Sequence, residues 1–216
     1  MGHQLPASPL NPVTTPGAAV THVLVVAVGA SAGGLHALST ILAALPADFP
    51  VPIVVVQHLA PYYPSKMALI LNRRTPLHVK RAKEGDHLRA GWVYVAPPAR
   101  HLLIRPDGTL TLTATPRVHH CRPSVDVFFQ SLAASVGARA VGVILTGADG
   151  DGADGVQAIR AAGGVTIVQD EPSSQFPYMP RAAVETGCVD YVLPLDEIAP
   201  KLIALTRTAS AEVKHV

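Results

Sequence analysis

Cysteine is scarce in this chain: among its 216 residues, only Cys121 and Cys188 carry a thiol. They lie far apart and neither belongs to a C-x-x-C pair, which excludes a disulfide framework and the ligand spacing of a zinc ribbon. The sequence therefore predicts two reduced thiols, as in cytoplasmic proteins, and it predicts no metal and no other cofactor.

Charged side chains are also few. They make up 15% of the residues, the formal net charge is +2, and the arginines are scattered along the chain. Proteins that bind nucleic acid usually gather basic residues on one face, so we expect no nucleic-acid partner. Hydrophobic residues account for 49% of the chain, which is enough for one α/β domain with a large core.

Long apolar segments are absent. No uninterrupted apolar run reaches the roughly 20 residues that span a bilayer, and the N-terminus lacks the basic and apolar regions of a signal peptide. The sequence predicts a cytoplasmic protein without membrane insertion. Residues 1–20 are rich in proline and are expected to form a flexible tail. The predicted domain covers residues 21–207, and a flexible C-terminal tail is expected at residues 208–216.

Apolar runs and helical patterns alternate through most of the chain. Residues 23–28 are apolar and largely β-branched, and the leucines that follow recur at helical spacing. The same alternation returns at residues 141–168. Strands without polar alternation are buried on both faces, which indicates a parallel sheet between helices. The predicted fold class is α/β, a doubly wound, mostly parallel sheet with helices on both faces.

The middle of the chain departs from this alternation. Residues 101–104 and 110–113 are short apolar runs on either side of Pro106-Asp107-Gly108. Asp-Gly between two such runs is typical of a tight β turn. We therefore expect a β-hairpin inserted into the alternating units. Near the C-terminus, the pattern predicts a closing helix at about residues 195–205.

A serine lies at the tip of the first strand-to-helix turn. Gly29, Ser31 and Gly33 match the G-x-S-x-G pattern, in which small residues permit a sharp turn and expose the serine. There the hydroxyl faces a helix N-terminus, whose free N–H groups can bind an oxyanion. Alternatively, Ser31 only caps the helix, or the glycines bind a dinucleotide. A dinucleotide site needs an acidic residue near the end of the second strand, where this chain has Gln57-His58.

Two more polar features follow apolar strands. His58 comes directly after the strand expected at residues 53–57, and the turn at residues 146–155 contains Asp149, Asp151 and Asp154. The carboxyl ends of strands in a doubly wound sheet meet in one crevice. A nucleophilic serine needs a base and an acid that orients the base. Ser31, His58 and an aspartate of this turn are therefore a candidate catalytic triad.

The aspartate turn has a second interpretation as a calcium loop. Asp149, Asp151 and Asp154 loosely follow the spacing of such a loop, but its fifth position is Ala153. Its twelfth position, which requires a bidentate glutamate, is Arg160. The pattern therefore favours catalysis over calcium, and Asp154 has a simpler role as a helix cap.

Several segments together resemble one known family, the catalytic domain of the chemotaxis protein-glutamate methylesterases, called CheB. Residues 29–34 resemble its nucleophile motif, residues 57–59 its base motif and residues 145–152 its aspartate motif. Further similar segments lie at residues 93–97, 122–126 and 179–181. The likeness runs in order from about residue 23 to residue 205, which makes it highly specific.

The resemblance implies hydrolysis of γ-glutamyl methyl esters on chemoreceptors, with release of methanol, and often deamidation of receptor glutamines. It implies that Ser31 is the nucleophile, His58 the general base and Asp151 the orienting acid. Ala32, Gly33 and Ala148 fall at the oxyanion site and pocket. The implied partner is the helical cytoplasmic region of a methylated chemoreceptor or a receptor-like protein. Because His58 must be neutral to accept the serine proton, activity is expected to rise with pH through the histidine range, near pKa 6.5 for an unperturbed histidine.

The chain departs from the family pattern at three pocket positions. Ala32 stands where the family usually has threonine, Ala148 where it has methionine, and Asp149 where it has glycine. The backbone N–H groups survive the two alanine changes, so we expect the chemistry to persist in a roomier pocket. Two alternatives stay open, a scaffold that binds a partner without turnover and a carboxylesterase for small molecules. The intact set of Ser31, His58 and an aspartate argues against a scaffold.

Members of this family with the full architecture carry an N-terminal receiver domain that covers the catalytic crevice until it is phosphorylated. Only about twenty residues precede the first expected strand here, against at least ~50 for an independent domain. Unless the sequence is a fragment of a longer chain, it therefore predicts a stand-alone catalytic domain that is active without phosphorylation.

Overall fold

The computed structural model describes residues 25–58 and 65–212. A seven-stranded sheet forms its centre, with strands β1 (Val25–Ala30), β2 (Ile53–Gln57), β3 (His78–Arg81), β4 (Trp92–Val95), β7 (Ala140–Ile144), β8 (Val165–Gln169) and β9 (Tyr191–Leu193). The strand order is β3-β4-β2-β1-β7-β8-β9, and neighbouring strands are parallel throughout. The predicted doubly wound parallel sheet is confirmed.

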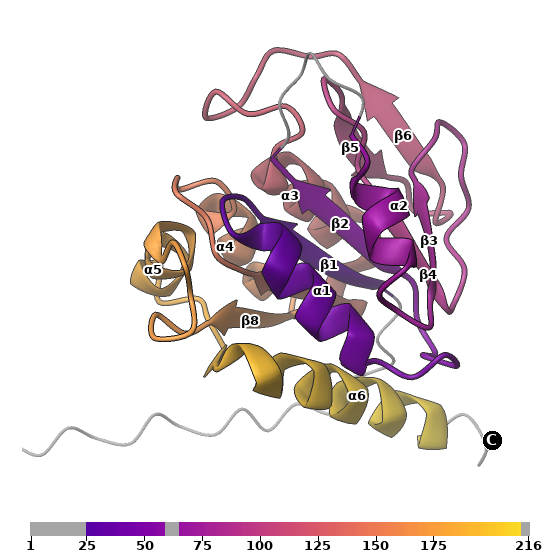
Figure 1. Cartoon of the computed structure of the whole chain (residues 1–216). Helices are drawn as coiled ribbons and strands as arrows, with labels where there is room; N and C mark the ends of the chain where they lie inside the picture. The colour runs from indigo at the N-terminus through magenta and orange to yellow at the C-terminus, as the bar shows by residue number, and fades with distance from the viewer. Residues whose placement is uncertain (1–24, 59–64, 213–216) are drawn as a thin grey trace, which may run out of the picture.

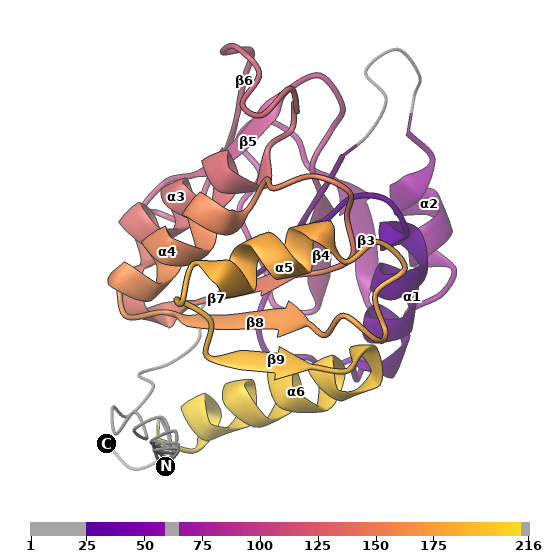
Figure 2. The same ribbon diagram turned by 90° about the vertical axis from the view of Figure 1, so that its left-hand side faces the viewer.

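Helices cover both faces of the sheet (Figures 1 and 2). They are α1 (Gly34–Ala44), α2 (Met67–Asn72), α3 (Val125–Val136), α4 (Ala153–Ala161), α5 (Tyr178–Glu185) and α6 (Leu195–Glu212), with a short 3-10 turn at Gly137–Arg139. Successive strand residues point to opposite faces. Val26 and Val28 therefore pack with α1, α2 and α6, whereas Val25 and Ala27 pack with α3, α4 and α5.

Helices α3 and α4 pack closely beside each other, and the sequence permits this approach. Ser124 caps α3 by accepting a hydrogen bond from the Val127 N–H at 3.4 Å. The aromatic side chains of Phe128 and Phe129 are fully buried behind this cap. Gly155 in α4 lies so close to Phe129 that a Cβ at position 155 would come within 2.5 Å of the Phe129 Cβ. The absence of a side chain at position 155 allows the start of α4 to lie next to α3.

The predicted hairpin is present, with strands β5 (His101–Ile104) and β6 (Leu110–Thr113) paired antiparallel in a sheet of their own. It packs against α3. The Ile104 N–H donates a hydrogen bond to the Ser131 hydroxyl at 3.2 Å, and the Ser135 hydroxyl donates to the Ile104 carbonyl at 2.9 Å. The hairpin thus extends the helical layer on one face of the sheet.

The C-terminal helix is longer than expected. We expected it to end near residue 205 and residues 208–216 to form a tail, but α6 continues to Glu212. Residues 201–212 contain no glycine or proline to end a helix, and the Thr206 hydroxyl is satisfied by donating to the carbonyl of Leu202. The tail expected at residues 1–20 lies outside the described residues. Over residues 25–58 and 65–212, no helix is both long and apolar enough to cross a membrane.

The order of the strands creates a switch point between β1 and β7. From β1 the chain proceeds to β2 on one side, whereas β7 and the strands after it lie on the other. Connections that leave in opposite directions open a crevice at the carboxyl ends of the two strands, where doubly wound proteins bind ligands. The residues that directly follow β1 and β7 therefore border this crevice.

Candidate active site

Ser31 lies at this switch point, directly after β1. Its backbone N–H donates to the Thr146 carbonyl after β7 at 3.0 Å, and its carbonyl accepts from the Gln57 side-chain amide at 2.7 Å. Gly33 begins the following helix with φ +78°, a left-handed conformation that favours glycine. Gln57 was not singled out from the sequence for this role. Its amide and the Gly33 turn together hold Ser31 at the mouth of the crevice.

The predicted oxyanion site has free donors. In the part of the chain that the structure describes, no group accepts a hydrogen bond from the N–H of Ala32, Gly33 or Ala148. Ala32 and Gly33 immediately precede α1, whose N-terminus carries partial positive charge. Gly147 packs behind the serine, because a Cβ at position 147 would overlap the Met179 sulfur and approach the Ser31 Cβ within 2.9 Å.

His58 follows β2 and is brought next to Ser31, since Ala30 and Gln57 are paired in the sheet. The His58 N–H donates to the Ala30 carbonyl at 3.1 Å. Its Nε2 lies 2.7 Å from Oδ2 of Asp151, as the candidate triad requires. Within the described residues, the Ser31 hydroxyl makes no hydrogen bond to the imidazole. The His58–Asp151 pair is therefore formed, and Ser31, the candidate nucleophile, lies beside it without a hydrogen bond to the ring.

Asp151 is buried and its carboxylate is held by the N-terminus of α3. It accepts hydrogen bonds from the Ser124 hydroxyl at 2.7 Å, the Val125 N–H at 2.6 Å and the Asp126 N–H at 3.1 Å. Burial alone would raise the pKa of Asp151, but the hydrogen bonds from His58 and from the helix end lower it below its usual range. Asp151 is therefore an ionised acceptor in a fixed position.

A second carboxylate makes the reciprocal contact, from α3 to the start of α4. Asp126, in the first turn of α3, accepts hydrogen bonds from the N–H groups of Gly152 at 2.9 Å and Gly155 at 2.7 Å, at the start of α4. Burial and the nearby charge of Asp151 raise the pKa of Asp126 to about 7. The two helices thus exchange carboxylate caps. No sequence pattern predicts this exchange, although Asp126 lies in a segment that resembles the CheB family.

Asp149 contacts the other nitrogen of His58. Its Oδ2 lies 3.0 Å from His58 Nδ1, and its side chain is 34% exposed. Burial would lower the pKa of His58, but hydrogen bonds to Asp149 and Asp151 outweigh this effect and raise the pKa to about 11. The value expected for an unperturbed histidine therefore does not apply in this conformation. Part of the rise comes from Asp149, the residue that departs from the family glycine.

The three carboxylates of the aspartate turn have different neighbours. Asp149 contacts His58, Asp151 is buried against α3, and Asp154 lies near His119 and Asp126. A calcium loop needs oxygen ligands that converge on one point, so the arrangement does not support that interpretation.

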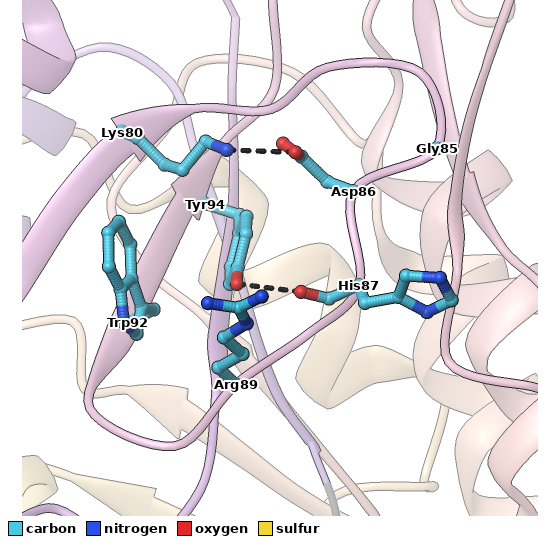
Figure 3. Close-up of a pocket in the computed structure, with 7 residues that line it drawn as sticks. All are labelled: Lys80, Gly85, Asp86, His87, Arg89, Trp92 and Tyr94. Carbon is cyan, nitrogen blue, oxygen red and sulfur yellow. Dashed lines mark hydrogen bonds and ion pairs between the residues drawn. The ribbon is translucent and has the colours of Figure 1, made fainter.

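A cleft of about 400 Å³ opens beside Ser31, and Gly33, Gln57, Met67, Arg74 and Gln175 are among its lining residues. A second cavity of about 250 Å³ lies near β3 and β4 (Figure 3). Its lining contains no serine or cysteine, and two of its polar side chains are engaged by other residues of the lining. Lys80 lies 2.8 Å from Asp86, and the Tyr94 hydroxyl donates to the His87 carbonyl at 2.9 Å. The cleft at Ser31 is therefore the candidate active site.

The fold and the site define an α/β protein with the residue set of a serine hydrolase, a strand-end serine beside a histidine–aspartate pair. The sequence profile of one family, described as CheB methylesterase, matches residues 26–202. The chain belongs to this family.

Relatives and a solved structure agree with this assignment. The chain is 48% identical over 190 residues to protein-glutamate methylesterase/protein-glutamine glutaminase 2 of Anaeromyxobacter dehalogenans, covering 88% of this chain but 55% of that protein. It is 42% identical to a putative enzyme of the same name from Leptospira interrogans, covering 83% and 93%. The CheB methylesterase catalytic domain of Thermotoga maritima superposes with a TM-score of 0.81 at 36% identity, covering 84% and 98%. The chain thus spans about half the length of the Anaeromyxobacter relative.

Proposed function

We propose that this chain is a protein-glutamate methylesterase that also deamidates glutamines. Its proposed substrates are γ-glutamyl methyl esters on the helical cytoplasmic region of chemoreceptors, and its proposed location is the cytoplasm. The observation that carries the proposal is the 2.7 Å contact between His58 and Asp151 beside Ser31 at the switch point. The relatives from Anaeromyxobacter and Leptospira are named for methylated glutamates and glutamines of a protein, which supports this substrate class.

In the proposed mechanism, the Ser31 oxygen attacks the ester carbonyl while His58 Nδ1 takes the hydroxyl proton. The tetrahedral oxyanion accepts hydrogen bonds from the free N–H groups near Ser31, those of Ala32 and Gly33 being the nearest in the chain. The intermediate collapses, the carbon–oxygen bond to methanol breaks, and the imidazolium gives its proton to the leaving methoxide. Water then hydrolyses the acyl-serine by the same steps, which releases the free glutamate.

Asp149 limits this mechanism in the conformation described. Each ring nitrogen of His58 faces a carboxylate, Nε2 toward Asp151 and Nδ1 toward Asp149. A carboxylate beside Nδ1 favours a proton on that nitrogen, whereas the Ser31 hydroxyl needs the unprotonated nitrogen as its acceptor, so the two contacts exclude each other. Turnover therefore requires the partly exposed Asp149 side chain to leave Nδ1.

Replacing Asp149 by the family glycine, Asp149→Gly, should shift the pH dependence of turnover toward acid. The change removes one of the two carboxylates that raise the pKa of His58, so the neutral base forms at lower pH. While that pKa exceeds the assay pH, each unit of its fall increases the neutral fraction about tenfold. The measurement is kcat/KM for methanol release as a function of pH, with Asp154→Asn as the control. An unchanged midpoint in Asp149→Gly would contradict the assigned contact.

Two exposed aromatic side chains next to the site favour a protein substrate over a small ester. Phe176 is 40% and Tyr178 is 59% exposed. The Phe176 carbonyl accepts a hydrogen bond from the Gly147 N–H at 2.8 Å, which fixes this segment beside the loop that contacts Ser31. Exposed aromatic residues on a fixed backbone are typical anchors for a partner protein.

The double variant Phe176→Ser/Tyr178→Ser should raise KM for a methylated receptor fragment by about tenfold, because apolar contact at a docking surface is lost. Its kcat should stay near that of the wild type, and hydrolysis of a small methyl ester should be unaffected. Val192→Ser is a matched control, since Val192 is 49% exposed on the edge strand β9. Equal losses on both substrates would favour the small-molecule esterase instead.

The function itself is tested by methanol release from a purified methylated receptor fragment, and by ammonia release from a fragment with glutamine at the same positions. Turnover of the methylated fragment supports the proposal. Binding of the fragment without methanol release would favour the scaffold alternative. Hydrolysis of small methyl esters alone would favour the carboxylesterase.

A further inference from the structure

The side chains of His58, Cys121 and Asp149 meet on the Nδ1 side of the His58 ring. His58 Nδ1 lies 3.0 Å from Asp149 Oδ2 and 3.6 Å from Cys121 Sγ, and the Cys121 sulfur lies 3.7 Å from the same Asp149 oxygen. The three atoms therefore form a closed triangle. They come from three separate segments, the end of β2, the loop before α3 and the loop after β7.

These distances match the spacing of ligands around a zinc ion. Zinc binds nitrogen and oxygen at about 2.0–2.2 Å and sulfur at about 2.3 Å with tetrahedral angles, so its ligand atoms lie about 3.3–3.6 Å apart. Each edge of the triangle is within a few tenths of an ångström of this range. Zinc displaces the proton of the Cys121 thiol and the proton on His58 Nδ1 when it binds. The resulting thiolate, the carboxylate and the neutral imidazole together neutralise a divalent ion, and thiolate with imidazole is a ligand pair that favours zinc.

The surroundings orient all three donors. The second ring nitrogen of His58 bonds to Asp151 at 2.7 Å, which is the carboxylate–histidine arrangement that supports histidine ligands of zinc. The other carboxylate oxygen of Asp149 accepts from the Asp151 N–H at 3.2 Å, which leaves Oδ2 for the ion. Cys121 and Val118 exchange two backbone hydrogen bonds, of 2.8 and 3.2 Å, which fix the loop that carries the thiol.

We propose that His58, Cys121 and Asp149 form a zinc site that switches off the candidate active site. Three protein ligands leave a fourth position open for water, as in exchangeable zinc sites. Cys121 is half-buried and Asp149 is 34% exposed, so an ion can enter from solvent. Bound zinc occupies the Nδ1 lone pair of His58, and the Ser31 proton then has no acceptor. Zinc binding is independent of the proposed esterase function, whereas the inhibition rests on it.

Another group of potential ligands in the described chain is a weaker candidate. His119, Asp126 and Asp154 lie close together, but this group contains no sulfur. One oxygen of Asp126 already accepts two hydrogen bonds from the start of α4. A thiolate-to-metal charge-transfer band therefore distinguishes the Cys121 site from this group.

The site is tested by titrating the tag-free, metal-free chain with Co²⁺ and recording the thiolate-to-cobalt charge-transfer band in the near ultraviolet, followed by displacement with Zn²⁺. We expect the band in the wild type and in Cys188→Ser, which removes the other cysteine. We expect no band in Cys121→Ser, and affinity at least tenfold weaker in Asp149→Gly. Circular dichroism verifies that each variant is folded. A missing wild-type band, or a band retained in Cys121→Ser, would overturn the site.

Inhibition is measured as methanol release before and after Zn²⁺, and again after a chelator, with each variant compared to its own metal-free rate. We expect reversible inhibition in the wild type and Cys188→Ser, and at least tenfold less sensitivity in Cys121→Ser. A cobalt band without inhibition would overturn the switch but keep the site. If the metal-free chain releases no methanol, the proposed function fails while the cobalt titration still decides the site.

Discussion

Ser31→Ala is expected to lower methanol release by a factor on the order of 10⁴–10⁶, as for other serine triads. The substitution removes the attacking oxygen and little else. Position 31 has alanine on both sides, and the hydrogen bonds that fix the turn use its backbone N–H and carbonyl. The thermal unfolding midpoint should therefore stay close to that of the wild type. The measurement is single-turnover and steady-state methanol release under identical conditions.

Ser39→Ala is the matched control for this experiment. Ser39 lies in α1, on the helix that begins beside Ser31, and its hydroxyl donates to the Leu35 carbonyl at 2.6 Å. This variant should keep nearly all of the wild-type rate. A triad knockout keeps only a very small residual activity. If Ser31→Ala retained more than about a tenth of the wild-type rate, Ser31 would not be the nucleophile.

Asp151→Asn should lower kcat by about 10⁴, the cost of an amide in place of the orienting carboxylate. An amide in that position presents N–H groups to neighbours that are themselves donors, the N–H groups of Val125 and Asp126 and the Ser124 hydroxyl. It also no longer favours the histidine tautomer that accepts a proton at Nδ1. Because Asp151 caps α3, we also expect a loss of stability of about 1–3 kcal/mol.

Asp149→Asn and Asp154→Asn complete the comparison. Both residues lie in the same turn or just after it, but neither lies at His58 Nε2. Neither variant should show the large loss of kcat that is expected of Asp151→Asn. If Asp149→Asn were the most damaging of the three, the orienting acid would be Asp149, which faces Nδ1. Denaturant unfolding of each variant separates loss of catalysis from loss of fold.

The centre of the sheet could be predicted because β1, β2 and β7 are short apolar runs with almost no polar residue. Burial of β1 and β2 on both faces follows from such runs, and a parallel sheet follows from that burial. The location of the site could also be predicted. Ser31 and His58 each come directly after a strand, and parallel strands end at one edge of the sheet. The positions of these two residues in the sequence were therefore enough to predict that they lie close together.

The environment of His58 could not be predicted in the same way. The contact between Asp149 and Nδ1 depends on the path of a loop and on a side-chain rotamer, which no periodic pattern encodes. The thiol of Cys121 reaches the same nitrogen from a loop more than sixty residues away in the sequence. The pKa of His58 follows from these contacts, so an ordinary value was the only basis available from the sequence.

The exchange of caps between α3 and α4 ties the chemistry of the site to the cohesion of one helical layer. Asp151 belongs to the loop before α4 but is anchored on α3, and Asp126 belongs to α3 but anchors α4. Separation of the two helix ends would break the hydrogen bonds of both carboxylates at once. We therefore expect the starts of α3 and α4 to open together and not one at a time. The His58 imidazole would lose its contact with Asp151 in the same event. The proposed catalysis therefore requires the contact between the starts of α3 and α4 to stay intact.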